Sequence, residues 1–215
     1  MASHFQETHF DRAKHVFHSP EFEEIIKDTI RFFNGTPVHK LPPPERFSGT
    51  GVYALYYIGK NVYYTSLYNQ NRLAFAQPIY VGKAVPRGWR QSKNAAEGVS
   101  SNSELYNRLK DHTKSIDAAK NLLLEDFFCR FMILEGGDAS LIATVEAALI
   151  RMFKPVWNSC LDGFGNHTPG AGRFNQAKSD WDVLHPGRNW AEKCTGMHNS
   201  KEDIVAQISK YLNND

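Results

Sequence analysis

Hydrophobic and polar residues follow a helical period near the start of the chain. Ser19 is a favourable N-cap residue, Pro20 suits the first helical turn, and Glu21 places an acid there. The apolar positions that follow share one helical face, and Gly35 is expected to end the helix. These positions are Phe22, Ile25, Ile26, Ile30 and Phe33. The pattern predicts an amphipathic helix that runs through residue 33.

Strand patterns begin at Gly51. Residues 51–58 are rich in β-branched and aromatic side chains, residues 59–61 suit a turn, and residues 62–65 are again β-rich, so a hairpin is predicted. Further strands are predicted over 76–82 and 127–134. Helices are predicted over 103–115, over a segment ending near 153 that Asp138 or Ser140 caps, and over 204–212.

The remaining segments carry no period. Residues 41–44 read Leu-Pro-Pro-Pro, which predicts a stiff linker separating the first helix from the core, and residues 160–200 predict long ordered loops. We therefore divide the chain into an N-terminal arm with its helix and linker (1–45), a core (46–158), and a loop-rich extension with a final helix (159–215). The expected class is α/β, with a small, mainly antiparallel sheet flanked by helices.

Composition excludes several classes of protein. The 215 residues are 41% hydrophobic and 22% charged, without an apolar run of membrane-spanning length or a signal-peptide core. Three scattered cysteines do not form a disulfide framework, so a cytoplasmic protein with no membrane partner is expected.

Charge is distributed unevenly along the chain. The net charge is +2, yet eight basic residues between positions 83 and 120 face only four acids, which suggests either a polyanion partner or a solvated helix face. The basic residues are Lys83, Arg87, Arg90, Lys93, Arg108, Lys110, Lys114 and Lys120.

Two predicted helices carry charged or polar groups on an apolar face. Glu146 shares its face with Ile142, Leu149 and Ile150, and burying a carboxylate there costs several kcal/mol unless a cation or strong donors meet it. On the 103–115 helix, His112 lies on the inward stripe with Arg108 beside it. A structural Arg–Glu ion pair would explain part of this pattern, and a functional site would explain all of it.

Two tyrosine motifs complete the set. Gly51-Val52-Tyr53 opens one strand, and Tyr80-Val81-Gly82-Lys83 closes another. With an arginine and histidine on the next helix, a glutamate on a later one and a downstream asparagine, residues 51–158 resemble the GIY-YIG nuclease superfamily. The positions that match are Tyr53, Tyr80, Arg108, His112, Glu146 and Asn158.

A second candidate for the later motif is Tyr57-Ile58-Gly59. Tyr53 and Tyr57 would lie about 13 Å apart along one strand, at about 3.3 Å per residue, and could not meet at one phosphate. We therefore assign the motif to Tyr80, and the long separation from Tyr53 implies an extra hairpin between the two strands.

The resemblance implies phosphodiester hydrolysis. Glu146 would hold one Mg²⁺ (or Mn²⁺), a hard cation that accepts few carboxylates and many waters, and Arg108 would clamp the phosphate. Tyr53 would be the general base and Tyr80 would orient the water. His112 is an alternative base because its ordinary pKa suits the task. Asn158 would fix the phosphate or Glu146 through its amide.

Among superfamily members the chain is similar to the type II restriction endonucleases that cut CCGCGG. A palindromic target implies a homodimer on double-stranded DNA, with long loops embracing the DNA. The linker after Phe33 would allow N-terminal segments to be exchanged between subunits. Candidate DNA contacts are Lys83, Arg87, Arg90, Arg173 and Arg188. A structure-specific repair nuclease and a catalytically silent DNA-binding protein remain the alternative interpretations.

Overall fold

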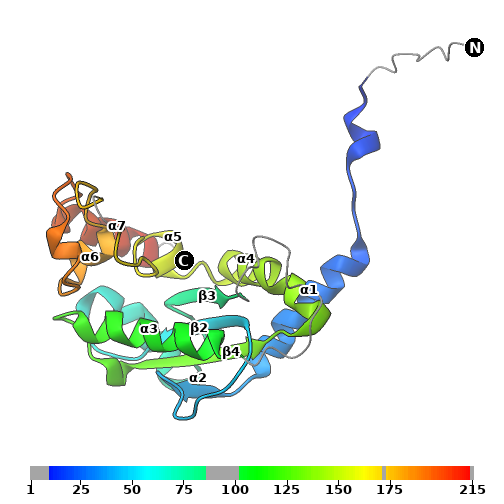
Figure 1. Cartoon of the computed structure of the whole chain (residues 1–215), viewed down its shortest axis with the longest axis horizontal. Coiled ribbons are helices and arrows are strands. Elements are labelled where there is room, and N and C mark those ends of the chain that lie inside the picture. Colours follow the sequence, from blue (N-terminus) through cyan, green and yellow to red (C-terminus); the bar gives the residue numbers. More distant parts are fainter. Residues whose placement is uncertain (1–9, 86–101, 171–172, 214–215) are drawn as a thin grey trace, which may run out of the picture.

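The computed structural model describes residues 10–85, 102–170 and 173–213 (Figure 1). Its strands are β1 (Val38–Lys40), β2 (Gly51–Tyr57), β3 (Tyr80–Ala84) and β4 (Phe127–Ile133). Its α-helices are α1 (Pro20–Gly35), α2 (Thr65–Ala74), α3 (Glu104–Ala118), α4 (Ile142–Phe153), α5 (Val156–Ser159), α6 (Asp180–Leu184) and α7 (Lys201–Asn213).

Within these residues the strands form one sheet in the order β1-β4-β2-β3, and every neighbouring pair is antiparallel. The expected α/β class, with a small antiparallel sheet flanked by helices, is therefore confirmed. No helix of the described residues has the length and apolar character needed to cross a membrane.

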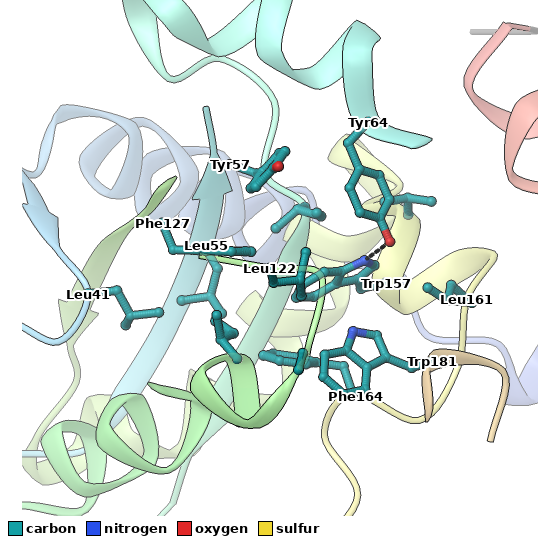
Figure 2. Close-up of a cluster of buried hydrophobic side chains, with 14 of the residues drawn as sticks. Leu41, Leu55, Tyr57, Tyr64, Leu122, Phe127, Trp157, Leu161, Phe164 and Trp181 are labelled. Carbon is teal, nitrogen blue, oxygen red and sulfur yellow. Dashed lines mark hydrogen bonds between the residues drawn. The ribbon is translucent and has the colours of Figure 1, made fainter. Parts of the chain in front are cut away.

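Strand β2 divides the interior into two cores, because all seven of its residues are buried and their side chains alternate between the faces of the sheet. Val52, Ala54 and Tyr56 pack with α4 and with Phe33 at the end of α1. Tyr53, Leu55 and Tyr57 face α3 and the C-terminal segments, in a core that is rich in aromatic rings (Figure 2). Its other large side chains include Phe127, Trp157, Phe164 and Trp181.

The connection between β2 and β3 corrects one expectation. The predicted hairpin is wrong: residues 62–64 form a 3₁₀ turn and α2 follows directly. The side chain of Asn61 accepts a hydrogen bond from the backbone of Tyr63, which starts this turn, and Asn71 donates to the carbonyls of Tyr57 and Gln77. These side-chain bonds fix a helical connection between β2 and β3, so the β propensity of residues 62–65 does not decide the structure.

The two ends of the chain differ in how they meet the core. The C-terminal extension contributes Trp181, Leu184, Ile204 and Ile208 to the core that contains Tyr53. At the other end, the 41–44 linker does not separate the whole of α1 from the core, because Phe33 is fully buried and β1 pairs with β4. The start of α1 and residues 10–19 before it project away from the body (Figure 1).

Candidate active site

The candidate residues converge from five elements. Strand β2 supplies Tyr53, β3 supplies Tyr80, and α3 supplies Arg108 and His112. Helix α4 supplies the carboxylate of Glu146, and α5 supplies the amide of Asn158. The ring centres of the two tyrosines lie 6.2 Å apart, and the ring of Tyr80 lies 5.2 Å from that of His112.

Gly82 leaves room for the side chain of Tyr53 to lie over the neighbouring strand. Tyr53 and Gly82 are directly paired across β2 and β3, and a Cβ atom at Gly82 would lie 2.4 Å from the hydroxyl of Tyr53. The phenol therefore occupies the space that a side chain would fill. The Tyr53 side chain of the first motif can therefore pack here only because the second motif has a glycine at position 82.

Tyr53 and His112 form a buried hydrogen-bonded pair. The hydroxyl of Tyr53 lies 2.5 Å from Nε2 of His112, and their side chains are almost entirely buried. Burial, reinforced by the charge of Arg108, holds the pKa of His112 well below its ordinary value, so the imidazole is neutral at pH 7. A neutral imidazole can accept at Nε2, so the Tyr53 hydroxyl can donate its proton to His112, and the charge of Arg108 acts on both groups.

The pKa of the tyrosines bears directly on which group is the base. Burial raises the pKa of Tyr53 well above the ordinary value for a phenol, although the nearby Arg108 offsets part of this effect. Burial also raises the pKa of Tyr80, again against the effect of Arg108. Tyr53 is therefore protonated in the structure and needs an acceptor for its proton before it can take one from water.

Glu146 has a cation partner, but it is Lys83 from β3. The Lys83 ammonium donates to Oε2 of Glu146, and the two side chains are 38% and 16% exposed. The alternative Arg108–Glu146 ion pair does not appear among the described contacts. Lys83, a candidate DNA contact, thus lies beside the carboxylate that is expected to bind metal.

The amide of Asn158 is engaged by the edge of β3. Its Oδ1 accepts a hydrogen bond from the Val81 nitrogen at 2.7 Å, and its Nδ2 donates to the Val81 carbonyl at 2.9 Å. These two bonds fix the backbone between Tyr80 and Gly82. In the structure Asn158 therefore holds the backbone of the second motif, and its role toward the phosphate or Glu146 stays a prediction.

Three residues of the C-terminal extension complete the site, and no sequence pattern distinguishes them. The ring of Phe164 stacks on His112, with centres 4.6 Å apart and planes 15° apart, and it meets Tyr80 edge-on. The carbonyl of Gly165 accepts from Nη2 of Arg108 at 3.2 Å, and Nε2 of His167 lies 2.6 Å from Nη1. Residues 163–170 have neither a motif nor a period that could have revealed them.

The remaining candidate DNA contacts have different surroundings. Arg87 and Arg90 lie outside the described residues, and Arg173 is exposed. Arg188 is 4% exposed, and its guanidinium is bound by Asp182 and by three backbone carbonyls. A buried and fully engaged guanidinium cannot reach DNA without breaking this network, so the expectation that Arg188 binds DNA is corrected.

The antiparallel sheet, the paired tyrosine motifs and the adjoining arginine, histidine and glutamate define a GIY-YIG nuclease fold. A family model for the Eco29kI GIY-YIG domain matches residues 45–212. The match covers well over half of the chain, so the chain belongs to this family of type II restriction endonucleases, whose namesake cuts CCGCGG. Membership makes the chain a nuclease with DNA as its substrate. A comparison with curated proteins finds no match.

Proposed function

We propose that the protein is a type II restriction endonuclease that hydrolyses both strands of duplex DNA at a short GC-rich palindrome. The observation that carries this proposal is the buried Tyr53–His112 pair, on which the nearby charge of Arg108 acts. A neutral imidazole at 2.5 Å can accept the phenol proton, which makes the phenol oxygen a proton acceptor for water.

The chemistry follows from these contacts. As water attacks phosphorus, its proton passes to the oxygen of Tyr53 while the phenol proton passes to Nε2 of His112. The P–O bond to the 3′ oxygen breaks with its electron pair on that oxygen, which takes a proton from solvent, and Arg108 stabilises the negative charge on the phosphate. Tyr80 orients the water. The two alternatives for the base are thus parts of one relay, with Tyr53 next to the water and His112 as the final acceptor.

Glu146 is the residue that would hold a divalent cation. It offers hard oxygen ligands on the face of α4 next to β3, and the described residues contain no group of three or more His, Cys, Asp or Glu side chains suited to a metal. A single carboxylate suits Mg²⁺ or Mn²⁺, which keep most of their waters. When bound, the cation supplies Lewis-acid stabilisation of the phosphate and the leaving oxygen.

A digestion experiment tests the function. Wild-type protein, Glu146→Gln and the matched control Asp138→Asn, an exposed acid just before α4, are incubated with Mg²⁺ and a long duplex of known sequence. We expect discrete fragments, with ends at CCGCGG, from the wild type and the control only. Cutting restricted to branched DNA would instead identify a repair nuclease, and binding without any cutting would identify a silent DNA-binding protein.

A palindromic target also requires a dimer, and the projecting arm supports one. The apolar stripe of α1 is buried at Phe33 but continues to residues that remain solvent-exposed, namely Phe22 (44%) and Ile25 (46%), and Phe17 before the helix is 86% exposed. Exposed apolar surface of this kind favours burial against another chain. We expect Phe17→Asp combined with Phe22→Asp to convert a dimer to a monomer in light scattering. A wild-type monomer would refute the exchange of N-terminal segments.

A further inference from the structure

One short loop of the C-terminal extension contacts two groups of the catalytic site. Residues 163–167 follow α5 and pass over α3, and they contribute Phe164, Gly165 and His167 to the surroundings of His112 and Arg108. Figure 2 shows Phe164 beside Trp181, deep in the aromatic core. The loop thus joins the interior of the extension to the reacting groups.

Arg188 fixes the course of this loop. Its Nη1 donates to the carbonyls of Phe164 and Asn166 at 3.1 and 3.3 Å, and its Nη2 donates to the carbonyl of Gly163 at 2.9 Å. The opposite edge of the guanidinium meets both oxygens of Asp182 at 2.6 and 2.7 Å. One buried cation therefore binds three backbone carbonyls of the loop and holds it in a single conformation.

Two indole rings restrict Arg188 further. Its guanidinium carbon lies 4.5 Å from the ring centre of Trp181 and 4.7 Å from that of Trp190. Two cation–π contacts, in addition to the ion pair, leave the side chain little freedom. The ion pair of Arg188 with Asp182 therefore holds the guanidinium in one place, and the guanidinium in turn holds the loop carbonyls.

The loop in turn restricts the groups that act on the substrate. Phe164 covers one face of the His112 ring, and a Cβ atom at Gly165 would lie 2.9 Å from the hydroxyl of Tyr80, so the loop backbone closes against that tyrosine. The guanidinium of Arg108 ends a long, flexible side chain, and the contacts to Gly165 and His167 occupy donors on both of its terminal nitrogens. These contacts select one orientation of Arg108.

We propose that the 163–167 loop is a positioning element for phosphodiester hydrolysis, in which His167 orients Arg108 and Phe164 orients His112. This inference rests on the proposed nuclease function. His167 is a positioning residue because it acts through Arg108, and the loop makes the C-terminal extension part of the catalytic machinery. A misplacement of about 1 Å can reduce a rate by about a hundredfold, so the loss of one such contact is measurable.

The test compares three variants in cleavage of the protein's own duplex site. His167→Ala removes the acceptor, His167→Gln offers an amide oxygen in its place, and His198→Ala removes another exposed histidine of the extension, whose Nδ1 lies near the Asn199 carbonyl. We expect His167→Ala to lower kcat about tenfold with KM changed less than about twofold. His167→Gln should recover most of the loss, and His198→Ala should match the wild type.

Other outcomes overturn the proposal. A rise in KM alone would make His167 a direct DNA contact, and faster cleavage by His167→Ala would make it a cap that the phosphate must displace. A second measurement, the Nε–H signal of Arg108 in nuclear magnetic resonance spectra (identified by its loss in Arg108→Lys), requires no cleavage. We expect this signal to broaden in His167→Ala and to stay sharp in His198→Ala. An unchanged signal refutes the positioning role, whereas a wild type that cuts no DNA refutes only the proposed function.

Discussion

Replacement of Arg188 by alanine should destabilise the protein more than any change at an exposed charge. In the structure Asp182 is 1% exposed, and the substitution removes both of its charged hydrogen bonds from Arg188 while the one from Ser179 stays. It also releases the carbonyls of Gly163, Phe164 and Asn166. Breaking a buried ion pair from one side typically costs about 3–5 kcal/mol, so we expect a loss of about 4 kcal/mol in the free energy of unfolding.

Urea unfolding followed by tryptophan fluorescence measures this loss, since Trp181 and Trp190 both contact the guanidinium. The melting temperature should fall by roughly 10 °C, at about 2–4 °C per kcal/mol for a chain of this size. The matched control is Lys178→Ala, which breaks the Lys178–Glu192 pair of the same extension. Because Glu192 is 50% exposed, that change should cost less than about 1 kcal/mol.

A double variant separates the charge from the packing. Combining Arg188→Met with Asp182→Leu leaves no uncompensated charge, so it should be less destabilised than Arg188→Ala, as buried pairs exchanged for apolar residues often are. An Arg188→Ala protein within about 1 kcal/mol of the wild type would refute the reasoning, because it would mean that the carboxylate finds water or another donor at no cost.

Three further predictions concern the sheet, the interior histidine and the carboxylate. Gly82→Ala should force the Tyr53 ring to move, and we expect the free energy of unfolding in urea to fall by about 1–3 kcal/mol. Cleavage should slow about a hundredfold, and unaltered cleavage kinetics would contradict this prediction. Burial lowers the pKa of His185 to about 3, so between about pH 3 and pH 6.5 the imidazole is protonated in the unfolded chain and neutral in the folded protein. Stability should therefore fall as the pH drops below about 6.5, by about 1.4 kcal/mol per pH unit from this group, and His185→Gln should lose that slope. Lys83→Met should free Glu146 and tighten Mn²⁺ binding by at most about fivefold in calorimetry, because the lysine is partly solvated; weaker binding would show that Lys83 does not compete with the cation.

The sequence was most informative where local signals act alone. The helix after Ser19 begins where the cap predicts, with the Ser19 hydroxyl accepting from the backbone of Phe22, and the final helix lies where the apolar period places it. The pattern missed β1, whose three residues are a strand only because they pair with β4. It also misread residues 62–65, because the hydrogen bonds of Asn61 and Asn71 outweigh β propensity there.

The site follows the same division. The resemblance to the GIY-YIG superfamily implied that Tyr53, Tyr80 and Arg108 meet, and the period of the strands and of the helix showed only which face of its element each residue occupies. The partner of Glu146 was not foreseeable from a basic segment alone, and the position of Phe164 depends on a loop with no period. Arg188 shows the converse error: an arginine in a loop-rich segment suggested a surface contact, whereas its carboxylate and indole partners converge only in the folded chain.

The paired bonds between Asn158 and Val81 also affect how the protein behaves in solution. Strand β3 ends the sheet, and an open strand edge is a template for pairing with other chains and for aggregation. The amide of Asn158 engages the Val81 N–H and C=O just as an adjoining strand would, and the backbone nitrogen of Trp157 covers the carbonyl of Ile79. The residue that holds the second tyrosine motif in place thus also ends the growth of the sheet, so its loss should favour self-association as well as disorder at the site.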